Sequence, residues 1–304
     1  MKPNTMAGRI LTATLVALFT FSTVPGFALS FQPLEPDGID PGTYLSPDGI
    51  SGPGEVVVGA SLPPMLFFNG DAQAFIWTKA GGAVALGFLP GGIGSAAAGV
   101  SRDGKTVAGT SFASDGEGDI GGTVSEAFIW TEAGGMVGLG AIDPEDSGTS
   151  EALAISDDGA TVVGSGTIGG PIDPSHAFRW TAATGIVDLG TLGGNASEAD
   201  GVSADGDVVA GWSVNSSGDF QAFRWTREAG MTAVPFLPGD IFCTFATVSG
   251  NGRVVVGQSE NSSGDTKRSF RWTKAEGNVD IGALASGQPT NVTAVSRDGS
   301  VIVG

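Results

Sequence analysis

Few side chains in this sequence have the chemistry that catalysis or metal binding requires. The 304 residues include one histidine, His176, and one cysteine, Cys243. A His/Cys zinc site needs more such ligands than these two, and a Ser-His-Asp triad would have to use His176. We expect no catalytic, metal or cofactor residue: His176 should form a local hydrogen bond at a strand end. Cys243 should be a small buried residue without a disulfide partner.

Carboxylates are the abundant reactive groups, and their number limits the partners of the chain. The sequence has 32 Asp and Glu against 14 Lys and Arg, a net charge of −18. Such a surface repels phosphate backbones and anionic lipids, which disfavours nucleic-acid binding and membrane adsorption. A glycosidase would need one pair of carboxyl groups at a defined separation. Most of the acidic residues lie in predicted turns, and their spacing singles out no pair.

One acidic loop has the alternation of a calcium site. Residues 115–122 read DGEGDIGG and place Asp115, Glu117 and Asp119 at every second position. An EF-hand loop has glycine at its sixth position, where this loop has Ile120. A solvated acidic loop is the preferred interpretation, and calcium binding stays open.

Two motifs recur in step along the chain and indicate a repeat. An aromatic strand of the form Ala/Ser-Phe-x-Trp-Thr occurs five times, with tryptophans at Trp77, Trp130, Trp180, Trp225 and Trp272. A turn of the form Ser-x-Asp/Asn-Gly occurs six times, beginning at Ser46, Ser101, Ser156, Ser203, Ser249 and Ser296, and a valine-rich run ending in glycine follows each. Asp-Gly between apolar runs is a strong hairpin signal, because glycine readily adopts the positive φ of the turn.

The pattern predicts four strands in each unit. The first precedes the turn, the second is the valine-rich run, the third is the aromatic strand, and the fourth follows a short Gly-containing loop such as residues 182–185. A four-residue loop there would place Arg179 opposite Asp188 and Arg271 opposite Asp280 as structural pairs. Because the Phe and Trp of the third strand share a face, they should fill the space between units. Replacing Trp180 by alanine should then cost about 3–5 kcal/mol.

Stacking such units radially gives the predicted fold class, an all-β β-propeller. It would have four-stranded repeats of about 45–55 residues, with five complete units and a half unit. The chain resembles the HAF repeat family of probable extracellular bacterial proteins. The family triplet stands at His176-Ala177-Phe178, and DLGTLGG from Asp188 and SADG from Ser203 also match. The other units have Gln73, Glu126, Gln221 or Arg268 in place of the histidine. The resemblance implies no activity or catalytic residue.

The N-terminus has the three parts of a secretory signal peptide. Lys2 and Arg9 precede an apolar stretch that is too short for a membrane span, and Ala28 and Ser30 form a small-x-small cleavage site. We predict a signal peptide at 1–30, a Pro/Gly-rich lead-in at 31–45 and one repeat domain at 46–304. The sixth unit stops at Gly304 after two predicted strands. Three explanations remain open: a longer chain, closure by the N-terminal segment, or pairing with another chain.

These features favour a secreted or cell-surface scaffold without enzymatic activity, which presents its blade loops to a protein or glycan. The loop between the second and third strands varies in length, and PPMLFF at 63–68 is unusually apolar for a loop. The alternative is a propeller-type hydrolase or lyase acting on extracellular polysaccharide. A third hypothesis is the passenger part of an exported protein, with an anchor or membrane barrel beyond Gly304. Carboxylates converging at one mouth of the propeller would favour the enzyme.

Overall fold

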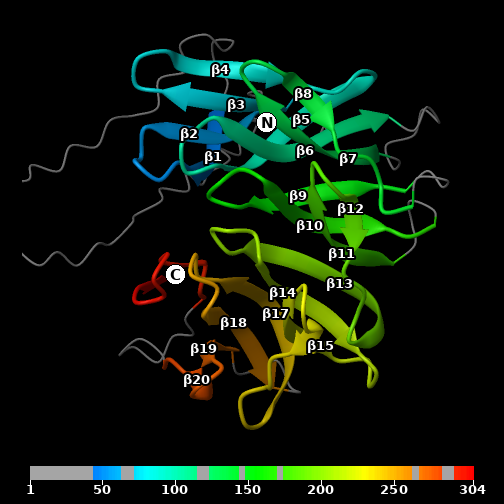
Figure 1. Ribbon diagram of the computed structural model, residues 1–304, viewed down its shortest axis with the longest axis vertical. Helices are drawn as coiled ribbons and strands as arrows, with labels where there is room; N and C mark the ends of the chain where they lie inside the picture. The colour runs from blue at the N-terminus through cyan, green and yellow to red at the C-terminus, as the bar shows by residue number, and fades with distance from the viewer. Residues whose placement is uncertain are drawn as a thin grey trace, which may run out of the picture. The chain divides into compact units, whose positions relative to one another are not determined.

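The computed structural model describes residues 44–62, 72–114, 123–143, 148–169, 174–261, 267–282 and 291–304, and every regular element in these ranges is a β-strand (Figure 1). The predicted signal peptide at 1–30, nearly all of the lead-in, the acidic loop at 115–122 and the PPMLFF stretch lie outside them. Within the described ranges no helix is long and apolar enough to cross a membrane.

The strands form five four-stranded antiparallel sheets in chain order, which we call blades 1 to 5. Blade 1 contains β1 (Tyr44–Ile50), β2 (Val56–Leu62), β3 (Gln73–Thr78) and β4 (Gly82–Gly87). Blade 2 contains β5 (Gly92–Val100), β6 (Thr106–Ser114), β7 (Thr123–Thr131) and β8 (Gly135–Gly138). Blade 3 contains β9 (Ser150–Ile155), β10 (Thr161–Thr167), β11 (Ser175–Thr181) and β12 (Gly185–Asp188).

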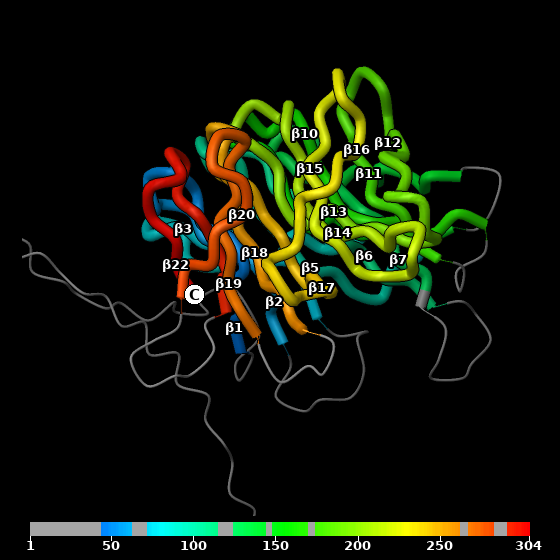
Figure 2. Tube along the Cα trace, turned by 90° about the horizontal axis from the view of Figure 1, so that it is seen from below, coloured from blue at the N-terminus to red at the C-terminus, as the bar shows by residue number. Residues whose placement is uncertain are grey.

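Blade 4 contains β13 (Gly193–Val202), β14 (Val208–Asn215), β15 (Phe220–Thr226) and β16 (Gly230–Ala233). Blade 5 contains β17 (Asp240–Val248), β18 (Val254–Asn261), β19 (Lys267–Thr273) and β20 (Gly277–Asp280). A two-stranded sheet of β21 (Ala294–Val295) and β22 (Ile302–Val303) follows, and we call it blade 6. The first strand of each of blades 2 to 5 packs against the second strand of the blade before it, so consecutive blades are neighbours in space (Figures 1 and 2).

The predicted turn of blade 1 is wrong by five residues. Residues 46–49 lie within β1, which pairs with β2, and the turn begins at Ser51 instead. There Gly54 N–H donates to the carbonyl oxygen of Ser51, and Ser51 Oγ accepts the N–H of Val56 at 3.1 Å. The same two bonds form at Ser101, where Oγ accepts from Thr106 at 3.0 Å. The distance to the glycine that ends the valine run therefore identifies this turn, whereas the Asp-Gly pair at 48–49 does not.

The predicted register between the third and fourth strands is wrong by one residue. The loop has three residues, so Arg179 stands opposite Val187, and Asp188 stands opposite Phe178. Arg179 is 8% exposed and turns toward blade 4. Its Nε donates to the carbonyl oxygen of Gly206 at 2.9 Å, and its Nη2 donates to Thr161 Oγ1 at 3.1 Å. The arginine therefore ties blade 3 to the turn of blade 4 and has no aspartate partner across the strand pair.

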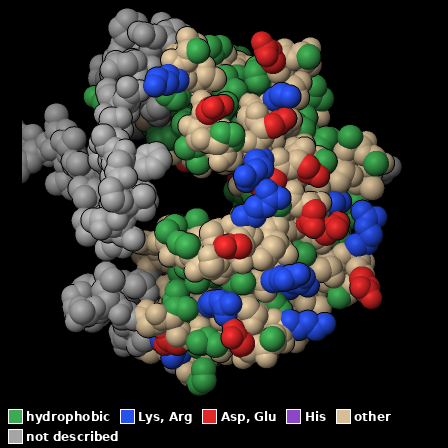
Figure 3. Space-filling model, turned by 60° about the vertical axis from the view of Figure 1, so that its left-hand side comes forward, with side chains coloured by type: hydrophobic (Ala, Val, Ile, Leu, Met, Phe, Trp, Pro, Cys, Tyr) green, Lys and Arg blue, Asp and Glu red, His purple; other side chains and the backbone are tan. Residues whose placement is uncertain are grey.

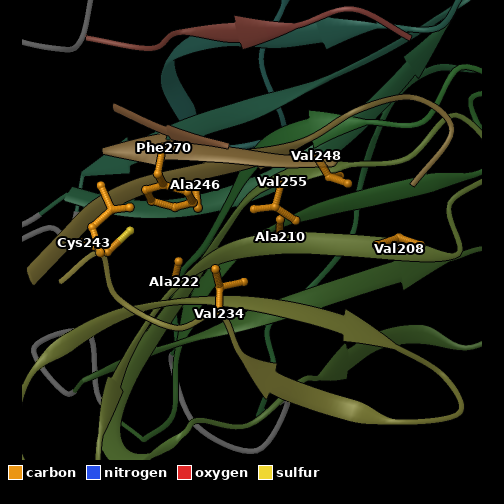
Figure 4. Close-up of a cluster of buried hydrophobic side chains, with 10 residues drawn as sticks. Val208, Ala210, Ala222, Val234, Cys243, Ala246, Val248, Val255 and Phe270 are labelled. Atoms are coloured by element: carbon orange, nitrogen blue, oxygen red, sulfur yellow. The ribbon is translucent and has the colours of Figure 1, made fainter. Parts of the chain in front are cut away.

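The core of the protein lies between consecutive blades, as the aromatic strand predicts. Phe178 is fully buried and packs with Ala108 and Ala127 of blade 2, while Trp180 is half-buried at the edge of that cluster. The phenylalanine, more than the tryptophan, therefore fills the space. The cluster between blades 4 and 5 is built in the same way around Phe270 and is shown in Figure 4.

The glycines that end the valine runs of blades 2 and 5, Gly109 and Gly257, make room for the phenylalanine ring of the same blade. At Gly109 a Cβ atom would lie 2.7 Å from Cζ of Phe128 and 2.2 Å from the carbonyl oxygen of Ala96. A side chain there would displace both the aromatic ring and the neighbouring strand, which explains why the motif ends in glycine.

A serine in the first half of the first strand joins each of blades 2, 3 and 4 to the blade before it. Ser197 Oγ accepts the N–H of Ala177 at 2.8 Å and donates to the carbonyl oxygen of Gly190 at 2.6 Å. Ser95 and Ser150 make the same two bonds to the preceding blades. Each bridge satisfies two backbone groups at a blade interface, which is why a buried polar residue recurs there.

Candidate functional site

Each blade has two ends, and they differ in their chemistry. The turn end carries the Ser-x-Asp-Gly turns, and the loop end carries the connections between the second and third strands. In the turns, Asp298 accepts hydrogen bonds from the Ser300 N–H and the Ser296 hydroxyl. These bonds lower the pKa of Asp298 to about 2. Asp103 and Asp205 make the equivalent bonds, and their pKa values are lowered as well. These carboxylates stabilise turns and are poor proton acceptors near neutral pH.

The second residues of the turns bring the blades together. Arg102 N–H donates to the carbonyl oxygen of Asp157, and Gly52 N–H donates to that of Arg102. The Asp157 carboxylate lies 3.8 Å from the Arg102 guanidinium and 3.0 Å from that of Arg297 in blade 6. The carboxylate of Asp157 thus interacts with two arginines and joins blades 2, 3 and 6. The second turn residues of blades 4 and 5, Ala204 and Gly250, have no ionisable side chain. This end is made of backbone, small residues and neutralised charge.

A cavity of about 1000 Å³ opens at the turn end between blades 4, 5 and 6. Its charged lining residues have both signs: Arg224, Arg253, Arg271, Lys274, Glu228, Glu276 and Asp298. Arg224 donates to the carbonyl oxygen of Gly252, and Arg271 pairs with Glu276. Acidic and basic side chains also alternate across the face in Figure 3. The cavity therefore presents no field of one sign to attract a charged ligand.

The first strand of blade 4 carries two acidic residues that contact each other. Burial and the neighbouring Glu198 raise the pKa of Asp200 well above its usual value, and Asp200 Oδ2 accepts the N–H of Ala246 in blade 5 at 3.2 Å. Glu198 Oε1 accepts Trp212 Nε1–H at 3.1 Å, and Glu198 Oε2 accepts the Ser165 hydroxyl at 3.3 Å. Sequence reasoning missed this pair. A carboxyl group with a raised pKa is what a general acid requires.

His176 forms the local hydrogen bond that the sequence predicts. Its Nδ1 lies 3.1 Å from both carboxylate oxygens of Asp188, the last residue of the fourth strand in blade 3. The same position ties the third strand to the exit of the fourth in other blades. Gln221 donates to the carbonyl oxygen of Val234, and Arg268 pairs with Asp280 at 3.6 Å. Histidine, glutamine and arginine are interchangeable in this role because each offers a donor.

Cys243 is fully buried, as predicted, and stands where blades 2 to 4 have the bridging serine. Its Sγ donates to the carbonyl oxygen of Phe245 at 3.4 Å. Burial, as the main cause, raises the pKa of the thiol to about 12. The thiol therefore stays protonated near neutral pH and is a poor nucleophile. No cluster of three or more His, Cys, Asp or Glu side chains that could hold a metal ion occurs among the described residues.

Comparisons with known proteins identify the fold. No family model matches the sequence, and no curated protein matches it. A putative TolB from Agrobacterium tumefaciens aligns with a TM-score of 0.51 and 17% identity over 78% of this chain and 80% of that one. A prolyl endopeptidase aligns with a TM-score of 0.60 and 13% identity over 86% of this chain and 39% of that one. Prolyl oligopeptidase B from Galerina marginata aligns with a TM-score of 0.53 and 11% identity, over 83% of this chain and 36% of that one.

The fold is a β-propeller. The similar structures are propeller proteins, and the five four-stranded sheets described here have the same organisation. The predicted fold class is therefore confirmed. The chain spans less than half of the two peptidases, and at these identities the likeness concerns the fold alone.

Proposed function

We propose that this protein is a secreted or cell-surface propeller scaffold that binds a protein or glycan partner through the loop ends of its blades, without catalysing a reaction. The predicted signal sequence at 1–30 and the resemblance to the HAF repeat family support export from a bacterial cell.

One observation carries the non-enzymatic part of the proposal. The side chains that could do chemistry at the turn end and between blades are used to hold the blades together. Asp157 lies between two arginines, Asp205 closes a turn, and Cys243 is a buried neutral thiol. The repeat preserves the turn contact from blade to blade, whereas the loop ends vary in sequence, as binding surfaces on rigid scaffolds do.

A propeller-type polysaccharide hydrolase or lyase is the second candidate, and the contact between Glu198 and Asp200 favours it. Asp200, whose pKa is raised, contacts a second carboxyl group, Glu198, and the two together resemble the carboxyl pair of a glycosidase. Against this role, both carboxylates already accept bonds that join structural elements. We therefore assign no catalytic role to the pair.

Incubation of the purified protein with neutral and acidic polysaccharides separates the two candidates. New reducing ends or unsaturated products should be absent, and the chain lengths should stay unchanged on size-exclusion chromatography. Product formation that disappears in Glu198→Gln, with the thermal midpoint unchanged, would establish the enzyme and contradict the scaffold.

A further inference from the structure

The interface between blades 4 and 5 breaks the repeat at three aligned positions close to the loop end. Trp212 follows Gly211, which ends the valine run of blade 4. Phe220 lies two residues before Ala222 of the third strand, and Phe242 directly precedes Cys243, which stands where blades 2 to 4 have the bridging serine. The residues at the first position in blades 1, 2, 3 and 5 are Ala60, Thr110, Ser165 and Gln258. Those at the second are Ala72, Ser125, Ser175 and Lys267. Those at the third, in blades 2 to 4, are Gly94, Thr149 and Ala196.

The three aromatic rings form one cluster, which we call the aromatic platform. The ring centroids of Trp212 and Phe220 lie 4.9 Å apart with an interplanar angle of 40°, and those of Phe220 and Phe242 lie 6.1 Å apart at 33°. Phe220 is 38% exposed, and the other two rings are half-buried. Direct ring contact at these angles makes a shallow surface and leaves no space between the rings for a cation.

The platform is held rigidly. The turn that leads into Phe220 is closed by Asn215, whose Oδ1 accepts the N–H of Ser217 at 2.9 Å and that of Asp219 at 3.0 Å. Trp212 is fixed by its bond to Glu198 Oε1. A binding surface that is already ordered loses little conformational entropy when it takes up a ligand.

Asp200 compensates for the presence of Trp212. Between blades 2 and 3, Thr110 Oγ1 accepts the N–H of Ala152 at 3.2 Å. A tryptophan at the Thr110 position has no acceptor for the equivalent N–H of Ala246, and Asp200 accepts that bond instead. Blade 4 thus carries a carboxyl group in an unfavourable environment, in contact with the Glu198 side chain that accepts the indole N–H of this tryptophan. Departures from a local rule that reduce stability are expected where a protein has a function to serve.

The platform and its fixed carboxylate match the two surfaces of a sugar ring. The C–H face of a pyranose packs on aromatic faces, and its hydroxyl groups donate to carboxylate oxygens. Glu198 accepts hydrogen bonds from Trp212 and Ser165 and also contacts the Asp200 carboxyl group, so at least one of the four lone pairs of its two oxygens is left for a ligand. The carboxylate of Glu198 disfavours an acidic sugar at this place.

We propose that the aromatic platform binds a ring of an uncharged glycan, with the sugar face on Phe220 and Trp212 and a hydroxyl group on Glu198. This inference rests on the proposed scaffold function and names the class of its ligand.

Calorimetric titration of the full chain with cellohexaose, maltohexaose, mannohexaose and chitohexaose tests the proposal. At least one should bind, and Phe220→Ala and Trp212→Gln should each weaken it at least tenfold. Glutamine suits the test because Gln258 occupies the same position in blade 5. Phe88→Ala is the matched control, since Phe88 is 42% exposed and lies on a different part of the chain. Its affinity, and the thermal midpoints of all variants, should match the wild type.

The outcomes separate the inference from the proposed function. If none of the four hexasaccharides binds, or if the two platform variants bind as tightly as the wild type, the platform is not the glycan site. Stronger binding of hexagalacturonate than of every neutral hexamer would also overturn the inference. If the wild type shortens the hexasaccharides, the non-enzymatic scaffold is wrong, whichever residues bind the sugar.

Discussion

The interface between blades 3 and 4 and the interface between blades 4 and 5 are built from the same repeat, but only the first follows its rules. Between blades 3 and 4, Ser197 bridges two backbone groups and Arg179 reaches the next turn. Between blades 4 and 5 the bridging serine is Cys243, and Trp212 displaces a polar residue. The comparison distinguishes residues that hold blades together, such as Ser197 and Arg179, from a residue such as Trp212 that departs from the repeat and is available for a ligand.

Removing the ring at the centre of the interface between blades 2 and 3, which has the same serine bridge as that between blades 3 and 4, should have the largest effect. Phe178→Ala should lower the free energy of unfolding by about 3–5 kcal/mol, because the ring is fully buried between blades. Trp180→Ala should cost less, because Trp180 is half-buried. Denaturant unfolding of both variants measures the difference. A larger loss for Trp180→Ala would contradict this assignment of the core.

The serine bridge gives the second comparison. Ser197→Ala leaves a buried N–H and a buried carbonyl without their partner and should cost about 1–3 kcal/mol. Cys243→Ser restores the residue that the repeat has there, and we expect a change of less than about 1 kcal/mol. Chemical unfolding of the two single variants is the measurement. Equal losses in both would show that the bridge contributes nothing specific.

Asp200→Asn should change the pH dependence of stability. The folded protein holds a proton on Asp200 above the usual pKa, so this group binds more protons folded than unfolded. Its contribution therefore falls as pH rises from the ordinary aspartate pKa through the raised folded value. Asparagine keeps an acceptor for Ala246 N–H and has no charge to bury. The variant should melt higher than wild type at pH 7 and like it at pH 4. A lower midpoint at pH 7 would show that the charged form stabilises the interface.

Asp205→Asn should have the smallest effect, with the opposite pH dependence. The Ser203 hydroxyl and the Asp207 N–H lower the pKa of Asp205, so its contribution is complete above the ordinary aspartate pKa and is lost as pH falls through the lowered one. Asn251 already forms this turn in blade 5. We expect the variant to lose under about 1 kcal/mol at pH 7. The loss should shrink toward pH 2 in thermal melts, and a loss independent of pH would contradict the charge-based explanation.

Most of the fold follows from the sequence because the repeat supplies several copies of each signal. The strands, the buried phenylalanine, the role of His176 and the burial of Cys243 all follow from residue types at repeated positions. The turn at Ser51 does not, because its Gly-Pro-Gly lacks the aspartate and Asp48-Gly49 lies within a strand. The predicted partner of Arg179 is wrong because one residue of loop length decides which side chains face each other.

The candidate site is much less predictable than the fold. Glu198 and Asp200 belong to one strand, but a bulge between Ala199 and Gly201 sends Asp200 to the next blade. Trp212, Phe220 and Phe242 are separated along the sequence by a turn and by the passage from one blade to the next. Aligning the units and asking where an aromatic residue replaces a small or polar one would have found them.

Hydrogen–deuterium exchange of the full chain, with and without the hexasaccharide that binds best, tests the division between the two ends most directly. Added glycan should slow exchange at residues 212–222 and 240–246, while the Ser-x-Asp-Gly turns at 101–106, 156–161 and 203–208 exchange at unchanged rates. Protection confined to the turns, or spread equally over all blades, would contradict the claim that the ligand binds close to the loop end of the irregular interface between blades 4 and 5.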